Sequence, residues 1–316
     1  MKDATPVAVT SRSFSRHPIL RSELLSRYEN VKFNADGRQL AGEDLVAFLR
    51  GHPKAITALE VIDESILSRL PELQVISKVG IGLDMIDLAA LDRYGVRLGW
   101  APGTNQRSVS ELVIAFAITL LRHVVPGVLE VRSGIWRQSK GRTLSGQTVG
   151  IIGLGNVGKD LVRILRPFGC HVLCYDILES PEFNTEHHVT PVDLETLLRE
   201  SEVVSVHLPL NDSTRNILSA DRLSRMKESA ILINTARGHL VDEGALKVML
   251  KTGRLAGAAF DVFATEPPED RELLALPNFL ATPHIGGSTE EAILAMGRAA
   301  IVGLDSAILA GSLCPR

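Results

Sequence analysis

A short glycine pattern near the middle of the chain restricts the folds that the chain can adopt. Gly153, Gly155 and Gly158 stand in the order G-x-G-x-x-G, directly after the apolar run VGII and before the helical stretch KDLVRILRPFG. Where a strand, a tight turn and a helix bind a pyrophosphate, the first glycine allows the turn, the second lets the backbone approach the phosphates, and the third lets the helix pack closely. The pattern therefore predicts a dinucleotide-binding unit in a parallel sheet.

A carboxylate strengthens this interpretation. Asp176 ends the next apolar run, HVLCYD, eighteen residues after Gly158. A carboxylate at the end of the second strand can accept hydrogen bonds from both ribose hydroxyls of adenosine, and it would repel the extra phosphate of NADP. We therefore expect NAD as the cofactor. The alternative is a glycine-rich turn beside an unrelated surface aspartate.

Strand-like and helix-like segments alternate along both halves of the chain. In the first hundred residues the strands are PVAVT, VKFN, AITAL, LQVISK and VRLGW, and from Thr148 they are TVGIIG, HVLCYD, VVSVHL, AILINT, GAAFDV and FLATPH. Helical patterns separate them, as in parallel sheets. We expect an α/β protein with two Rossmann-like or flavodoxin-like domains, the larger of which is a doubly wound dinucleotide-binding domain.

The domain boundaries follow from breaks in this alternation. Pro102 and Gly103 interrupt the first series, and a long apolar helix is expected from Ser108 to Arg132. After the glycines at 286 and 287, one helical pattern remains over residues 289–309. It is too short to be a domain, so we expect it to pack on the N-terminal part. The predicted domains are residues 1–102 with 288–316, and residues 103–287.

Composition excludes several classes of function. A net charge of −3, a pI near 6.3 and the lack of a basic run argue against a nucleic-acid partner. Cys170, Cys174 and Cys314 are odd in number and lack metal-ligand spacing, so we expect no disulfide framework, no metal site and a cytoplasmic location. The longest apolar run, Leu112 to Leu121, has about half the length that spans a bilayer, so no membrane segment is expected.

Three polar residues follow strands of the second series, where open parallel sheets bind ligands. They are Arg237 in NTARG, Glu266 in FATEPP and His284 in PHIGG. A histidine can remove a hydroxyl proton while hydride leaves the same carbon, a carboxylate can hold the imidazole, and a guanidinium can bind a substrate carboxylate. Each residue alone could serve an ion pair, a turn or a loop. Together they favour a nicotinamide-dependent dehydrogenase.

The ordered motifs resemble the D-isomer-specific 2-hydroxyacid dehydrogenase family. The resemblance extends over essentially the whole chain, through VGIGLDMID, NQRSVSELVIA, GIIGLGNVG, NTARG, AAFDVFATEPP and TPHIGGST. It implies that Arg237, Glu266 and His284 are catalytic. It also implies that the two end segments form the substrate-binding domain and that residues 103–287 bind NAD.

The resemblance also implies contacts for the ligands. For the cofactor it assigns the three turn glycines Gly153, Gly155 and Gly158, Asn156 and Val157 at the pyrophosphate, Asp176 at the ribose, His207, Pro209 and Thr214 near the adenine, Thr235, Ala236 and Asp261 near the nicotinamide, and Gly287. For the substrate it assigns Lys78, Val79, Gly80 and Asn105.

The substrate itself is less constrained. NQRSVSELVI and HIGGST are most similar to family members that act on D-3-phosphoglycerate, which is the first expectation and would place the protein in serine biosynthesis. Leu59 and Glu60 stand where such enzymes often carry Arg-Ser, which weakens this expectation. Glyoxylate, hydroxypyruvate or a branched keto acid is the alternative. A non-enzymatic NADH-sensing scaffold uses the same fold, but the three catalytic residues favour an enzyme.

The apolar run LVIAFAITLL also predicts an oligomer. A helix with apolar residues all round its surface has no face suited to water. We expect a homodimer built around the helix between Ser108 and Arg132. Packing within one chain is the alternative.

Overall fold

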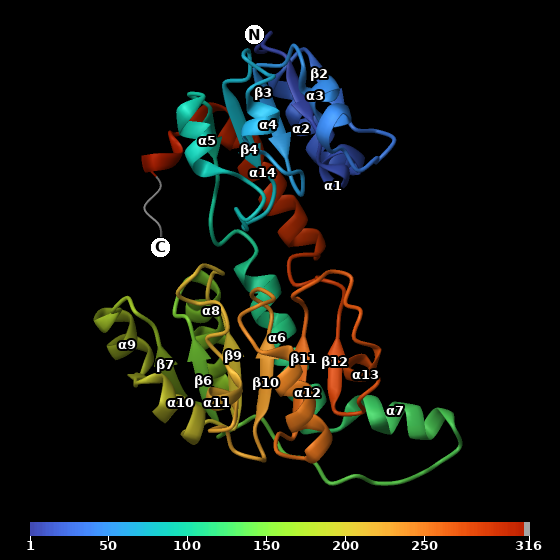
Figure 1. Cartoon of the computed structure of the whole chain (residues 1–316), viewed down its shortest axis with the longest axis vertical. Coiled ribbons are helices and arrows are strands. Elements are labelled where there is room, and N and C mark those ends of the chain that lie inside the picture. Colours follow the sequence, from blue (N-terminus) through green and yellow to red (C-terminus); the bar gives the residue numbers. More distant parts are fainter. Residues whose placement is uncertain (313–316) are drawn as a thin grey trace. The chain divides into compact units, whose positions relative to one another are not determined.

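The structure, a computed structural model, describes residues 1–312 and divides the chain into two compact units. The smaller unit contains Met1–Asn105 and the chain from Gly287 onward, and the larger unit contains Gln106–Gly286 (Figure 1). Helix α6 begins at Gln106, so the first boundary lies three residues after the predicted one, and the second lies one residue before it. The predicted two-domain α/β fold is confirmed.

The smaller unit is built on a parallel sheet of five strands in the order β2-β1-β3-β4-β5. The strands are β1 (Val7–Val9), β2 (Val31–Phe33), β3 (Lys54–Thr57), β4 (Val75–Lys78) and β5 (Arg97–Gly99). The helices are α1 (Arg12–Arg16), α2 (Pro18–Arg27), α3 (Gly42–Leu49), α4 (Glu64–Leu67), α5 (Leu88–Arg93) and α14 (Glu290–Ser306), with a short 3-10 turn, η2, at Ala310–Ser312. Four of the five strands fall within predicted segments, β3 begins one residue before the predicted segment AITAL, and α1 was not predicted.

The last helix, α14, belongs to the core of the smaller unit. Ile301 and Leu304 on α14 share an apolar cluster with Phe14 and Leu20 from α1 and α2. The prediction that the final helical segment packs on the N-terminal part is therefore confirmed. A second cluster on the other face of the sheet contains residues of α3, α4 and α5.

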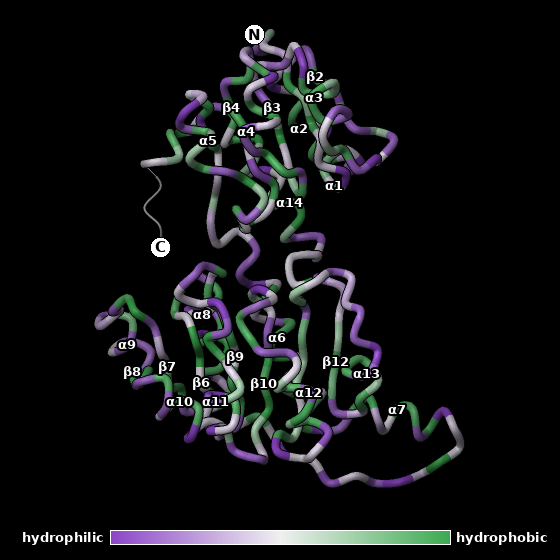
Figure 2. The backbone as a smooth tube through the Cα atoms, in the orientation of Figure 1, coloured by the Kyte–Doolittle hydropathy of each residue, from purple (hydrophilic) through white to green (hydrophobic). Residues whose placement is uncertain are grey.

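The larger unit has a parallel sheet of seven strands in the order β12-β11-β10-β9-β6-β7-β8. The strands are β6 (Thr148–Ile152), β7 (His171–Tyr175), β8 (Val189–Pro191), β9 (Val203–Val206), β10 (Ile231–Asn234), β11 (Gly257–Phe260) and β12 (Phe279–Ala281). The order reverses between β6 and β9, which makes the sheet doubly wound. Apolar strands run through the middle of this unit (Figure 2). The edge strand β8 was not predicted.

Helices cover both faces of this sheet. They are α6 (Gln106–Leu121), α7 (Val124–Arg132), α8 (Asn156–Leu165), α9 (Pro181–His187), α10 (Leu194–Glu200), α11 (Ala220–Leu223), α12 (Glu243–Thr252) and α13 (Arg271–Leu274), with a 3-10 turn, η1, at Arg166–Phe168. Residues of α6 and α8 fill the core on one face, and residues of α10, α11 and α12 fill it on the other. The sheet is therefore buried on both sides, as parallel sheets are.

The prediction of one helix from Ser108 to Arg132 is wrong. Helix α6 ends at Leu121, His123 takes a left-handed backbone with φ 53°, and α7 continues at an angle of 61°. Pro126 explains the break, because its ring would clash with the carbonyl of Arg122 in a continuous helix and it has no N–H to donate. Within residues 1–312, no single helix is long and apolar enough to cross a membrane, although the bent pair α6 and α7 passes that test by length and composition.

Candidate active site

The glycine turn between β6 and α8 has the geometry of a phosphate cradle. Gly153 has φ 100°, and a Cβ atom on it would lie 2.8 Å from the backbone of His207. A Cβ atom on Gly155 would meet nothing within 4 Å, so open space lies beside the backbone there. A Cβ atom on Gly158 would lie 2.2 Å from the Gly153 carbonyl oxygen, so this helix can pack here only with glycine. Within the described part of the chain, no side chain caps the start of α8, which leaves its amides for an anion.

Asp176, at the end of β7, holds this turn in place. Its Oδ2 accepts a hydrogen bond from the Leu154 amide at 2.6 Å, and its Oδ1 accepts one from the Leu178 amide at 2.8 Å. The carboxylate is half-buried beside the turn. These residues fit the adenosine diphosphate part of NAD, since phosphates need the open backbone of the turn and the ribose needs an acceptor beside it.

The other predicted cofactor residues follow β9 and β10. His207 hydrogen-bonds through Nε2 to the Ser205 hydroxyl at 2.8 Å, and burial lowers the pKa of His207 to about 3, so this ring is neutral at physiological pH. Thr214 donates to the Pro209 carbonyl at 2.7 Å and so closes the loop after β9. Thr235 is buried, and its hydroxyl has no hydrogen-bond partner among residues 1–312.

The turn after β10 presents Arg237. The buried side chain of Asn234 shapes this turn, accepting from the Ala236 amide at 3.1 Å and donating to the Arg237 carbonyl at 2.9 Å. The guanidinium donates from one nitrogen to the Ala236 carbonyl at 2.7 Å. A guanidinium has five N–H donors in a planar fork, which suits it to bind a carboxylate through two of them.

Gly238 brings the turn of Arg237 against the loop that follows β11. A Cβ atom on Gly238 would lie 2.0 Å from the Phe263 carbonyl oxygen, so the two backbones can meet only with glycine at this position. In the same loop, Glu266 accepts through Oε1 from the Phe263 amide at 3.1 Å, and Glu243 accepts from the Ala264 amide at 2.8 Å. Arg237 and Glu266 are thus held on adjoining loops.

The third loop, after β12, carries His284 in a left-handed backbone with φ 54°. Buried Asp261 at the end of β11 holds this loop. Its Oδ1 accepts from the Thr282 hydroxyl at 2.5 Å and the Ile285 amide at 2.7 Å, and its Oδ2 accepts from the Gly286 amide at 2.7 Å. Both carboxylate oxygens of Asp261, predicted to lie near the nicotinamide, therefore hold the histidine loop.

His284 and Glu266 form a direct pair. The distance from His284 Nδ1 to Glu266 Oε2 is 2.9 Å. Because a carboxylate only accepts hydrogen bonds, the imidazole proton lies on Nδ1, which leaves Nε2 to exchange a proton with a substrate. The two side chains are 52% and 40% exposed, so a ligand can reach the pair. The structure thus brings all three predicted catalytic residues to the carboxyl edge of one sheet.

The predicted substrate residues lie in the smaller unit. Lys78, at the end of β4, is buried, and its Nζ donates to the carbonyls of Ala58 and Val79. Gly80 follows with φ 108°. Gly287, assigned to the cofactor from the sequence, belongs to this unit, where a Cβ atom on it would lie 3.0 Å from the side-chain nitrogen of Asn105. The roles of these residues stay predictions.

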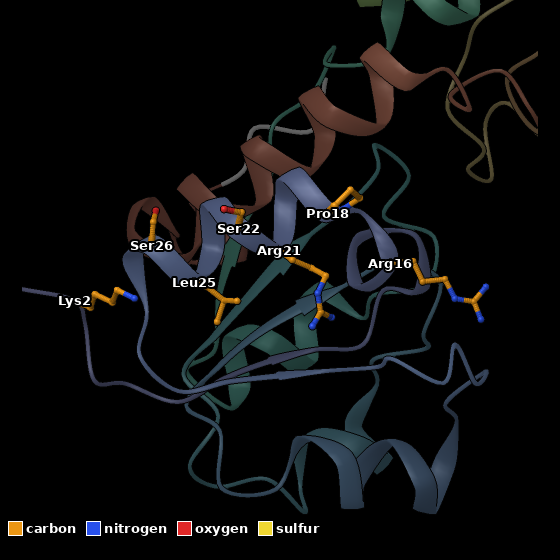
Figure 3. Close-up of a pocket in the computed structure, with 7 residues that line it drawn as sticks. All are labelled: Lys2, Arg16, Pro18, Arg21, Ser22, Leu25 and Ser26. Carbon is orange, nitrogen blue, oxygen red and sulfur yellow. The ribbon is translucent and has the colours of Figure 1, made fainter.

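Two hollows are lined by residues that were not predicted for the site. One of about 700 Å³ lies over α2 in the smaller unit and is lined by Lys2, Arg16, Pro18, Arg21, Ser22, Leu25 and Ser26 (Figure 3). Another of about 160 Å³ is lined by Glu243 and by residues of the loop that carries Glu266, among them Phe263 and Thr265. Among residues 1–312, no group of three or more His, Cys, Asp or Glu side chains is placed to hold a metal ion, and Cys314 lies outside the described residues.

Several residues that build the site were not predicted. Asn234, Gly238 and Glu243 act on the backbones of the catalytic loops, as described above. Asn234 had a visible signal, because it is a polar residue at the end of the apolar run ILIN. The contact of Gly238 joins positions 25 residues apart along the chain and had no local signal.

Comparison with known proteins finds one matching family and several similar chains. Residues 114–286 match the D-isomer specific 2-hydroxyacid dehydrogenase, NAD binding domain family. The chain is 40% identical over 225 residues to a hydroxypyruvate reductase of Thermotoga maritima, with 70% of this chain and 72% of that protein covered. It is 36% identical over 239 residues to a D-3-phosphoglycerate dehydrogenase of Methanocaldococcus jannaschii, with 75% and 46% covered. A solved glyoxylate reductase from Paecilomyes thermophila superposes with a TM-score of 0.85 at 26% identity, covering 96% and 95% of the two chains.

Proposed function

This chain belongs to the D-isomer-specific 2-hydroxyacid dehydrogenase family, and we propose that its preferred substrate is a short, unphosphorylated 2-keto acid, hydroxypyruvate or glyoxylate, or the corresponding 2-hydroxy acid. The protein is an NAD-dependent oxidoreductase. The proposal therefore concerns the substrate and the residues that act on it.

The side chains of the larger unit account for the chemistry. NAD, when bound, accepts or supplies the hydride. In the oxidation direction His284 Nε2 takes the proton of the substrate hydroxyl, and in the reduction direction the protonated ring returns it. Glu266 fixes the ring through Nδ1 and stabilises the imidazolium. Arg237 binds the substrate carboxylate, which orients the reacting carbon toward the histidine.

One observation carries the choice of an unphosphorylated substrate: the residues after β3 and β4 offer little positive charge. Glu60 places a carboxylate there and accepts through Oε2 from the Ala58 amide at 2.7 Å, while Leu59 is 68% exposed. The Lys78 ammonium is buried and already donates to two carbonyls. Because a phosphate ester carries up to two negative charges, Glu60 would repel it. A hydroxymethyl group or a hydrogen atom suffers no such penalty.

D-3-phosphoglycerate is the second candidate. The segment NQRSVSELVI and the similarity to a D-3-phosphoglycerate dehydrogenase favour it, as does a lysine at position 78. Under this alternative, the ammonium of Lys78 would leave its carbonyl partners to bind the phosphate. A place in serine biosynthesis belongs to this alternative.

Steady-state kinetics with NADH would test the proposal. We expect a higher kcat/KM with hydroxypyruvate or glyoxylate than with phosphohydroxypyruvate. Glu60→Gln keeps an oxygen for the Ala58 amide and removes the charge, so it should raise kcat/KM for phosphohydroxypyruvate by about tenfold, as expected for removing a partly screened repulsion. Faster wild-type turnover of phosphohydroxypyruvate, together with a Lys78→Ala variant whose KM rises for that substrate alone, would favour the second candidate.

The proposal includes a homodimer in the cytoplasm. The evidence for a second copy of the chain as partner comes from α7 and the segment after it. No residue of α7 is buried, although five of its nine residues are valine or leucine. Their exposed apolar side chains fit an interface between two copies of this chain better than they fit water.

A further inference from the structure

We propose that Ser108 is a positioning residue for His284. Its hydroxyl fixes the peptide of Gly286, the last residue of the larger unit, and thereby the loop that carries the histidine. The inference rests on the proposed catalytic role of His284 and adds a residue that acts through that loop.

The first contact joins segments far apart in the sequence. Ser108 Oγ donates to the Gly286 carbonyl at 2.6 Å, across 178 positions of the chain. Ser108 lies in the first turn of α6 and is 8% exposed, so water competes little for this bond. A short bond to a carbonyl in a water-poor place fixes that carbonyl more firmly than an exposed bond would.

The second contact holds the same residue from its other side. The Gly286 amide donates to Asp261 Oδ2 at 2.7 Å, so the amide and the carbonyl of Gly286 are both occupied. The space around Gly286 is also filled, since a Cβ atom there would lie 3.0 Å from Asp261 Oδ2 and 3.4 Å from a methyl of Val109. Ser108 and Asp261 therefore clamp the peptides on either side of Gly286.

The clamp matters because of the backbone next to it. His284 adopts a left-handed conformation, which residues with a Cβ atom adopt only when neighbouring contacts hold them there. The chain leaves the larger unit directly after Gly286, and it enters that unit at Gln106, two residues before Ser108. The hydrogen bond of Ser108 thus joins the segment where the chain enters the larger unit to the segment where it leaves that unit.

Ser108→Ala would test the proposal with two readouts. We expect the Kd for NADH to stay unchanged and kcat to fall about 3- to 10-fold, the effect of one buried hydrogen bond. In protein labelled with 13C at the histidine Cε1 atoms, the His284 resonance should shift or split, and His284→Gln identifies that resonance. Ser108→Thr, which keeps the hydroxyl, should restore both readouts.

Ser201→Ala is the matched control. Ser201 is another buried serine of the larger unit, and its hydroxyl donates to the Leu197 carbonyl at 2.7 Å, away from the catalytic loops. This variant should keep the wild-type kcat and the wild-type His284 resonance. An equal loss of kcat in Ser201→Ala would overturn the proposal, because it would show a general cost of removing a buried hydroxyl.

Three further results would refute the positioning role of Ser108. They are a kcat for Ser108→Ala within twofold of wild type, an unchanged His284 resonance in that variant, and a loss of kcat that Ser108→Thr does not rescue. If Ser108→Ala does not fold, Ser108→Cys keeps the volume with a weaker donor and takes its place. Wild-type turnover by His284→Asn would refute the proposed role of His284 instead, and the resonance of Ser108→Ala would still report on the clamp.

Discussion

At the scale of single residues, proton transfer depends on two side chains that meet from different loops. We expect His284→Asn to lower kcat by about 10²- to 10⁴-fold, the usual contribution of a general acid–base group. Glu266→Gln should lower kcat less, because an amide still accepts from Nδ1 over a similar distance but does not stabilise the imidazolium. Stopped-flow measurement of hydride transfer would separate these losses from changes in product release.

The Kd for NADH provides the control for both variants. Neither side chain is assigned to the cofactor, so fluorescence titration should give Kd values within about threefold of wild type, a difference under 1 kcal/mol. Wild-type turnover in His284→Asn would contradict the mechanism. A large rise in the Kd would show instead that the substitution disturbs the loop.

A second residue, Asp176, is expected to determine the preference for NAD over NADP. Its carboxylate stands beside the glycine turn, where the additional phosphate of NADP would approach it. Two unit charges about 4 Å apart repel by roughly 4 kcal/mol at an effective dielectric constant near 20, and salt reduces this. We expect kcat/KM to favour NADH over NADPH by about 10- to 1000-fold.

Asp176→Asn separates charge from hydrogen bonding. The amide keeps an oxygen for the Leu154 N–H but removes the negative charge, so the preference for NADH should shrink while turnover with NADH stays measurable. A wild-type protein that binds NADPH more tightly than NADH would refute this role of Asp176.

The residues that could be predicted from sequence are those whose position along a strand defines their place. Arg237, Glu266 and His284 each follow a strand of one parallel sheet, so the topology alone brings them to one edge. Ser108 and Gly238 could not be predicted in the same way. Their contacts depend on the exact approach of two backbones, and neither partner is marked by a local pattern.

At the scale of elements, a polar cluster fastens α14 to the sheet of the smaller unit. Lys54 Nζ donates to Asp305 at 2.8 Å and to the Tyr28 hydroxyl at 2.9 Å, and that hydroxyl donates to Asp305 at 2.6 Å. We expect Lys54→Met to lower the free energy of unfolding by about 1–3 kcal/mol at neutral pH, because it leaves a hydrogen-bonded carboxylate without its cation. Urea unfolding would measure this.

The effect should depend on pH in a defined direction. Burial alone would lower the pKa of Lys54, but its hydrogen bonds to Asp305 and Tyr28 outweigh burial and raise that pKa. Burial alone would raise the pKa of Asp305, but the hydrogen bonds that Asp305 accepts from Lys54 and Tyr28 outweigh burial and lower that pKa. Burial and the hydrogen bond to Asp305 also raise the pKa of Tyr28 from its ordinary value of 10.0. The stabilisation is therefore fully present between the ordinary pKa values of 3.8 for Asp305 and 10.0 for Tyr28. It is lost as the pH rises through the raised pKa values of Tyr28 and Lys54 or falls through the lowered pKa of Asp305.

Arg69→Met is the control for this prediction. Arg69 pairs with Glu43 on the surface, where 38% and 82% of the two side chains are exposed. Such pairs contribute about 0–1 kcal/mol, so this variant should unfold almost as the wild type does. Equal losses in the two variants would mean that the cluster around Lys54 adds nothing beyond an ordinary surface pair.

Elements with a strong apolar pattern could be predicted, and short ones could not. Strands β6, β9 and β10 are buried along most of their length, and their sequences are mainly apolar. The edge strand β8 has three residues and ends in proline, so its sequence resembles a turn. The helix break at His123 could have been predicted from Pro126, but the apolar residues on both sides of Pro126 favoured one continuous helix.

At the scale of the whole molecule, the segment from Val124 to Trp136 has few partners within its own chain. Leu129 is 58% exposed, Ile135 52% and Trp136 83%, and α7 buries none of its side chains. Side chains of this kind are costly to leave in water, at about 25 cal/mol per Å² of apolar surface. The run LVIAFAITLL, from which an oligomer was predicted, lies in α6, and Val113, Phe116, Ala117, Leu120 and Leu121 of that run are buried within the larger unit. The apolar side chains that stay exposed are mainly those of α7 and the segment after it.

We therefore expect two copies of the chain to associate through this segment. Light scattering at micromolar concentration should give twice the chain mass of 34.3 kDa. Leu129→Asp combined with Trp136→Ser should shift the mass toward one chain, because a carboxylate placed in an apolar interface loses its hydration without gaining a partner. Val248→Asp, at an exposed valine of α12, adds the same charge elsewhere in the larger unit and should leave the mass unchanged. A wild-type protein that runs as one chain, or a double variant that stays dimeric, would show that this segment is not the interface.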